Sequence, residues 1–158
     1  MGGQEPEPLV IQFDLKPYVG VGPVAFGMSS ADVDSLLGPP SRVLKNREGD
    51  RQEYREGLIL TYAQADDGLV DITLTPPASA LYEGRDLLAL ENPISFLRAF
   101  DSTPLKAVGI TVFFQLGISL TGFDLPADPQ KGVGLFAKGS WDSLRHRLRP
   151  LGSQPTKP

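Results

Sequence analysis

Hydrophobic and polar residues alternate along much of the chain with the period of two that is typical of β-strands. The clearest case is the segment 69–75, where Val70, Ile72 and Leu74 are each followed by a polar residue. This pattern predicts a strand with one buried face and one solvated face. Further strand-like runs lie at 9–13, 24–26, 42–45, 52–55, 58–63, 108–115, 118–125 and 133–138.

Local capping signals predict helices between these strands. Ser29 followed three residues later by Asp32 is an N-terminal capping pattern, and Gly38 with two prolines after it ends a helix over 29–37. Asn92 followed by Pro93 begins a second helix, because Asn is a preferred N-cap and Pro suits the first helical position. The segment 140–148 predicts a short terminal helix.

The order of these elements predicts an α+β fold, in which an antiparallel β-sheet carries two helices packed on one face. We expect a single domain over 9–151 with flexible tails at 1–8 and 152–158. Both halves contain a helix, a variable stretch, a strand that begins at a glycine, a loop and another strand. This order is consistent with a tandem repeat of 18–85 and 86–151 joined edge to edge, and chance similarity is the alternative.

The stretch from Gly27 to Pro40 resembles the helix of small bacterial domains of the BamE/SmpA type, which opens at a glycine and closes with Leu-Gly-x-Pro before an antiparallel hairpin. A tandem pair of such units is similar in plan to beta-lactamase inhibitor protein, and the resemblance implies binding of a target on a concave sheet face. The plan also resembles uncharacterised bacterial families, including immunity-type proteins. This chain lacks the lipobox cysteine and the disulfides, since it has no cysteine.

Composition excludes several kinds of site. The net charge of −4 disfavours nucleic acid as a partner, because that binding depends on clustered cations. One histidine and no cysteine leave no credible zinc site, and we expect no metal and no cofactor. No segment approaches the roughly 20 apolar residues that span a bilayer, so we expect no membrane insertion. Absence of cysteine fits the cytoplasm, although a cleaved signal sequence would leave no trace here.

The motifs that resemble catalytic or ligand sites are incomplete. Asp66-Asp67-Gly68 lacks the ligand spacing of a calcium loop and is a typical hairpin turn. The pairs Gly20/Gly22 and Gly132/Gly134 lack the rest of a nucleotide-binding fingerprint. Glu53 and Glu56 could serve as paired acids, but nothing distinguishes them from other surface carboxylates. The sequence therefore predicts that the chain is not an enzyme.

The polar face of the sheet is the candidate binding site. Strand alternation assigns eight residues to the side away from the helices: Thr61, Asp71, Thr73, Thr111, Phe113, Gln115, Ser119 and Thr121. Phe113 is the expected anchor, since exposed aromatic side chains often anchor interfaces. The alternative is that a loop or the N-terminal segment covers Phe113, and Phe136 lies within reach of the same face.

These observations favour a non-enzymatic protein-binding domain that uses its open sheet face, such as an immunity-type inhibitor or an accessory factor. The expected partner is another protein, whose identity the sequence does not give, and the oligomeric state is also left open. A structural or oligomerising domain is the second reading. A small-ligand-binding protein or enzyme is the third, which a large apolar pocket with convergent carboxylates would favour.

Overall fold

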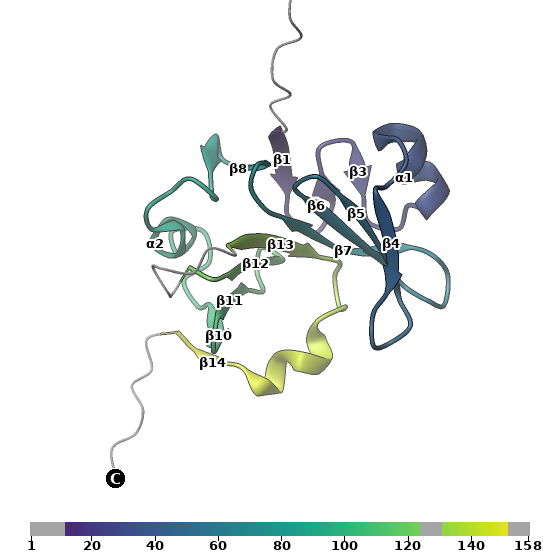
Figure 1. The fold of residues 1–158 in the computed structure, drawn as a ribbon. Coiled ribbons are helices and arrows are strands. Elements are labelled where there is room, and N and C mark those ends of the chain that lie inside the picture. Colours follow the sequence, from purple (N-terminus) through teal and green to yellow (C-terminus); the bar gives the residue numbers. More distant parts are fainter. Residues whose placement is uncertain (1–11, 124–130, 152–158) are drawn as a thin grey trace, which may run out of the picture.

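The computed structural model describes residues 12–123 and 131–151, which form 14 strands in two sheets and three short helices (Figure 1). The tails expected at 1–8 and 152–158, and the loop expected at 124–130, lie outside the described residues.

The larger sheet is antiparallel throughout. In spatial order its nine strands are β14 (Arg149–Pro150), β10 (Leu105–Ala107), β11 (Ile110–Phe113), β12 (Ile118–Thr121), β13 (Gly132–Phe136), β7 (Leu69–Leu74), β6 (Leu58–Tyr62), β5 (Arg51–Arg55) and β4 (Arg42–Lys45).

The smaller sheet has five strands, in the order β3 (Val24–Ala25), β2 (Gly20–Val21), β1 (Gln12–Lys16), β8 (Ser79–Tyr82) and β9 (Arg85–Asp86). Here β1 and β8 pair in parallel, and the other neighbours are antiparallel.

The helices are short. α1 (Ser30–Leu37) has the capping box predicted from Ser29 and Asp32, and at its C-cap Gly38 has a φ of 84°, which glycine adopts without strain. α2 (Pro93–Leu97) begins at the predicted Asn92 cap. The terminal helix expected at 140–148 is a 3₁₀-helix, η1 (Asp142–Arg147).

The expectation of an α+β sheet covered by two helices is wrong, because the protein is mostly β. The buried face of the larger sheet shares one hydrophobic cluster with strands of the smaller sheet, including Phe13, Leu15 and Ala80. α1 buries only Val33, and α2 buries only Pro93 and Leu97. A second sheet therefore covers the core. Its strands are only two to five residues long, and its β1–β8 pairing is remote in sequence.

The two halves of the chain meet edge to edge at β13 and β7, where Val133 lies opposite Leu74 and Leu135 opposite Ile72. Each of these strands is the last of a four-stranded meander, β10-β11-β12-β13 or β4-β5-β6-β7. That the two halves arose by duplication stays a prediction.

A buried carboxylate connects α1 to the larger sheet. Glu53 is fully buried, and its carboxylate accepts hydrogen bonds from three side chains: Arg51 (3.0 Å), Arg55 (3.1 Å) and Tyr62 (3.3 Å). Arg55 continues to the Asp34 carboxylate (2.6 Å) and to the C-cap carbonyl of α1 (2.7 Å). Burial, followed by the negative charge of Glu53, raises the pKa of the Tyr62 hydroxyl. We call these residues the Glu53 network.

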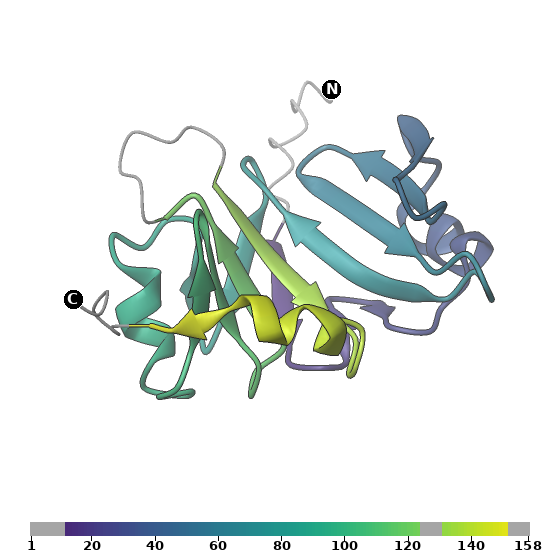
Figure 2. The ribbon, with the colours of Figure 1, turned by 90° about the horizontal axis from the view of Figure 1, so that it is seen from below.

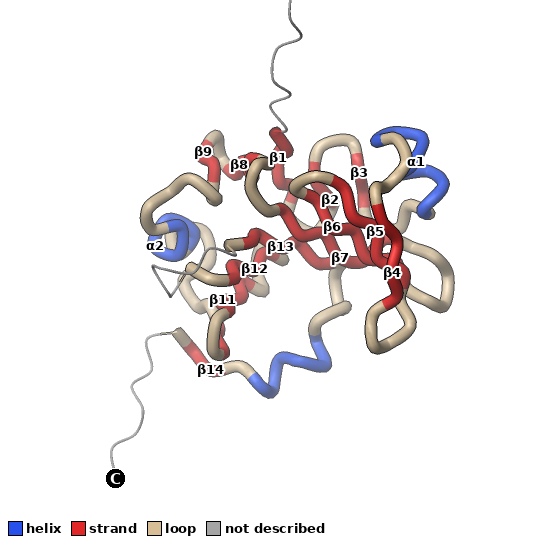
Figure 3. The backbone as a smooth tube through the Cα atoms, in the orientation of Figure 1, coloured by secondary structure: helices blue, strands red, loops and turns tan. Residues whose placement is uncertain are grey.

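Residues 137–151, here called the C-terminal segment, return from β13 to the far end of the larger sheet. The segment begins with a backbone hydrogen bond from Ala137 to Val70, passes through η1, and pairs β14 with β10 (Figure 3). Viewed from below, it crosses the strands of the second half of the chain and leaves β4 and β5 uncovered (Figure 2).

Candidate functional site

Five of the eight residues predicted for the polar face do share one face of the larger sheet. Thr61 lies opposite Asp71, Thr73 and Ser119 both flank Gly134, and Thr121 lies opposite Gly132. Directly opposed residues of antiparallel strands point to the same side, so these pairs place five side chains together: Thr61, Asp71, Thr73, Ser119 and Thr121.

Phe113 and Thr111 are on the opposite face, and the expected role of Phe113 as an exposed anchor is wrong. Phe113 is fully buried in the core and lies opposite Ile118. The predicted register carried the alternation of odd-numbered residues through the β11–β12 turn. Because four residues, 114–117, separate the paired positions, the alternation reverses at the turn. Gln115 lies in that turn and is exposed.

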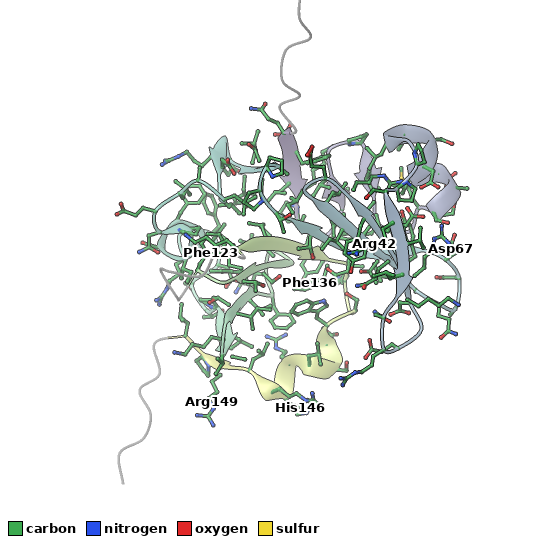
Figure 4. The ribbon with its side chains drawn as sticks, viewed as in Figure 1. Arg42, Asp67, Phe123, Phe136, His146 and Arg149 are labelled. Atoms are coloured by element: carbon green, nitrogen blue, oxygen red, sulfur yellow. The ribbon has the colours of Figure 1, made fainter. Side chains whose placement is uncertain are left out.

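The C-terminal segment covers the β13 part of the polar face through an aromatic cluster. Phe136 lies opposite Asp71, and the Trp141 ring stacks on it with centroids 4.8 Å apart. Tyr18 and Phe114 contact Phe136 edge-on, at 5.9 Å and 5.6 Å. Phe136 is therefore buried, although it projects from the polar face (Figure 4). The face expected to be open is closed here.

Asp71 lies beside this aromatic cluster in an environment unusual for a carboxylate. Burial raises the pKa of Asp71 to about 7, while the Trp141 indole N–H donates a hydrogen bond to the carboxylate and partly opposes the shift. No sequence pattern indicated this contact, because Trp141 lies far from Asp71 along the chain.

A cleft of about 360 Å³ opens between the β4–β5 hairpin and the C-terminal segment. Carboxylates of Glu48, Asp50 and Asp71 line it together with Trp141 and Leu144. The predicted site residue Thr61 also lines this hairpin cleft, where its hydroxyl accepts a hydrogen bond from Gln52 (3.2 Å). Within the described ranges, no group of three potential metal ligands occurs in this cleft or elsewhere.

The edge of the sheet next to this cleft is formed by β4. All four residues of β4 are exposed, including Val43 (41%) and Leu44 (44%). The other three sheet ends, β14, β3 and β9, are strands of two residues. Natural sheets commonly protect their edges by making edge strands short. β4 is the longest of these ends.

The ladder between β4 and β5 determines which backbone groups of β4 point outward. The Asn46 amide bonds the Asp50 carbonyl at the hairpin loop (2.9 Å). Because hydrogen-bonded pairs alternate along antiparallel strands, Leu44 faces β5 and the N–H and C=O groups of Val43 and Lys45 face outward. Among the described residues, no strand pairs with this edge.

Two cations also mark the edge. Arg42 and Lys45 are exposed, and the Arg42 guanidinium lies 4.7 Å from the centroid of the Tyr54 ring. None of the ion pairs within the described residues includes Arg42 or Lys45. The edge therefore combines outward backbone groups, two apolar side chains and two positive charges.

Of the two acids considered as a catalytic pair, Glu53 is enclosed by the Glu53 network and Glu56 is exposed. Glu53 has no exposed surface through which a substrate could reach it, so its carboxylate has a structural role.

Comparisons with protein families, with curated proteins and with solved structures each found no match. The resemblance of Gly27–Pro40 to BamE/SmpA domains stays an expectation from the sequence. Across the described residues, no helix is both long and apolar enough to cross a lipid bilayer.

Proposed function

We propose that this chain is a non-enzymatic protein-binding domain that adds an extended segment of its partner to β4. The exposure of β4 carries this proposal, because β4 is a sheet end of four residues whose Val43 and Leu44 are both solvent-accessible. Strand addition uses outward N–H and C=O groups for affinity and alternate side chains for specificity.

Charge indicates the chemistry of the partner segment. Arg42 and Lys45 project on opposite faces of β4, so an added strand with acidic side chains near both positions would form favourable cross-strand pairs. A second copy of β4 would bring like charges together, which disfavours self-pairing. The partner segment is therefore an acidic, extended stretch of another protein.

The hairpin cleft lies at the Asn46 end of β4 and extends the same surface. Leu44 projects from the same sheet face as Gln52, which lines the cleft, because these two residues are directly opposed. A segment paired with β4 can thus place a neutral side chain over Leu44 and into the mouth of the cleft, whose carboxylates disfavour an acidic one.

The test compares two variants at one position. Val43→Pro removes an outward N–H that the β4–β5 ladder does not use, whereas Val43→Ala keeps that N–H and removes only two methyl groups. The probe is a phage-displayed library of random dodecapeptides selected on the wild-type chain. Affinities of the selected peptides are then measured by calorimetry on all three proteins.

We expect selected peptides to be rich in acidic and β-branched residues. Their affinity should fall about tenfold or more in Val43→Pro, since a lost hydrogen bond and a steric block together cost about 1.4 kcal/mol or more. Val43→Ala should lose less. Equal affinities for Val43→Pro and Val43→Ala would refute strand addition, as would peptides whose binding depends on Trp141 in the cleft and not on residue 43.

A further inference from the structure

A basic hollow of about 540 Å³ lies at the end of the larger sheet opposite β4. It is lined by Lys106, Ala107, Val108, Arg147 and Arg149, with no acidic residue among them. The lining comes from β10, the β10–β11 turn, the end of η1 and β14. Arg149 and the neighbouring His146 project from the rim of the molecule toward solvent (Figure 4).

Two of these cations face each other across a strand pair. In the β10–β14 ladder Lys106 lies directly opposite Arg149, so their side chains project from the same face. Like charges in such a position destabilise an antiparallel pair. Arg147, two residues before Arg149, adds a third cation to the same hollow. The pairing thus holds Lys106 and Arg149 together at a cost to the fold, and Arg147 lines the same hollow.

No acidic side chain of the described residues forms an ion pair with these cations. The ion pairs of the described chain involve Arg51 and Arg55, and none includes Lys106, Arg147 or Arg149. The neighbouring Arg145 differs, because its guanidinium lies 4.6 Å from the centroid of the Phe114 ring and belongs to the aromatic cluster. The concentration of cations is notable in a chain whose net charge is −4.

We propose that this basic hollow binds the phosphate group of a phosphorylated ligand. A guanidinium donates two parallel hydrogen bonds to phosphate oxygens and a lysine adds a point charge, so one anion can bridge all three side chains. A bound phosphate would attract both Lys106 and Arg149 and so offset the repulsion between these two cations. The hollow has the volume of small-molecule sites, and the fully exposed Val108 supplies an apolar contact for the rest of the ligand.

The same chemistry is offered by a soluble phosphorylated molecule and by a lipid headgroup. The experiment therefore has two arms at constant ionic strength. In the first, tripolyphosphate is titrated into the ¹⁵N-labelled full chain, with sulfate as the comparison anion. In the second, sedimentation measures binding to phosphatidylcholine vesicles with and without a phosphatidylinositol phosphate.

Two triple variants that remove the same charge isolate the site. Lys106→Gln/Arg147→Gln/Arg149→Gln removes the hollow's cations, and the control Arg47→Gln/Arg98→Gln/Lys138→Gln removes three exposed cations that belong to neither the hollow nor the β4 edge. We expect saturable amide shifts at residues 106–109 and 147–149, with affinity reduced about tenfold or more in the first variant and unchanged in the control. The first variant should also melt at the wild-type temperature or slightly above it.

Binding of tripolyphosphate without vesicle binding would support a soluble ligand, and additional binding to phosphoinositide vesicles would support a headgroup. Shifts that do not saturate, an equal response to sulfate, or equal losses in the two triple variants would show general charge attraction and overturn the proposal. The outcome is independent of strand addition at β4, because the two surfaces share no residue.

Discussion

Replacing Glu53 by Gln tests whether the Glu53 network connects α1 to the sheet. The substitution keeps the shape of the side chain and removes its charge, which leaves the Arg55 guanidinium with Asp34 as its remaining acidic partner. The Arg55 side chain is only 10% exposed, so water cannot replace the lost carboxylate. Arg51, with 41% of its side chain exposed, can turn to solvent.

Removal of one partner from a buried ion pair costs about 3–5 kcal/mol. Because Asp34 still pairs with Arg55 and Arg51 is solvated, we expect the low end of this range, about 3 kcal/mol. For a chain of this length that loss lowers the melting temperature by roughly 6–12 °C. The control is Glu56→Gln, three residues away and exposed, which should change stability by less than about 0.5 kcal/mol.

Guanidinium unfolding followed by circular dichroism gives both free energies of unfolding and shows whether the m-value is unchanged. A loss for Glu53→Gln as small as that for Glu56→Gln would mean that the Glu53 carboxylate is hydrated. In that case the network would not hold α1 against the sheet.

Three further predictions follow from the register and from burial. Phe113→Ala should lower the free energy of unfolding by about 3–5 kcal/mol in chemical denaturation, because it empties a core site. An unchanged free energy would mean that Phe113 is exposed. Leu44→Pro should lower the melting temperature more than Val43→Pro, since the Leu44 N–H donates a hydrogen bond to β5 and the Val43 N–H does not. The opposite order would mean that Val43, and not Leu44, is hydrogen-bonded to β5. The pKa of Asp71 in the folded chain, about 7, lies above its ordinary value. Between pH 4 and 7 Asp71 should therefore be protonated in the folded chain and ionised in the unfolded chain. The free energy of unfolding should fall as the pH rises through this window. Fluorescence of Trp141, the single tryptophan, should titrate near pH 7 in the wild type and not in Asp71→Asn, whereas a midpoint near pH 4 would show a solvated carboxyl.

Signals that act within a few residues predicted the local elements well. Ser29 and Asp32 gave the start of α1, and the alternation around Ile72 gave β7. The Asp67-Gly68 turn indicated the β6–β7 hairpin, where Asp67 has a positive φ of 57°. These features depend on neighbouring side chains and backbone, which the sequence contains explicitly.

Errors arose where a distant segment or the length of a turn decides the outcome. The β1–β8 pairing that forms the second sheet joins residues from opposite ends of the first half of the chain, and no local sequence pattern predicts it. Phe113 was assigned to the wrong face because alternation is reliable within one strand but depends on turn length across a hairpin. Trp141 stacks on Phe136 from a segment whose direction the sequence does not specify.

The path of the C-terminal segment determines where partners can bind. An amphipathic strand pattern shows that one sheet face is polar, but it does not show what lies over that face. Here Trp141 closes the face above Phe136, so the surface that stays accessible shifts toward β4 and the hairpin cleft. The same segment then brings Arg147 and Arg149 beside Lys106 at the other end of the sheet. Because the strand order places β4 and β14 at opposite ends, a partner strand on β4 and an anion in the basic hollow would not compete for space.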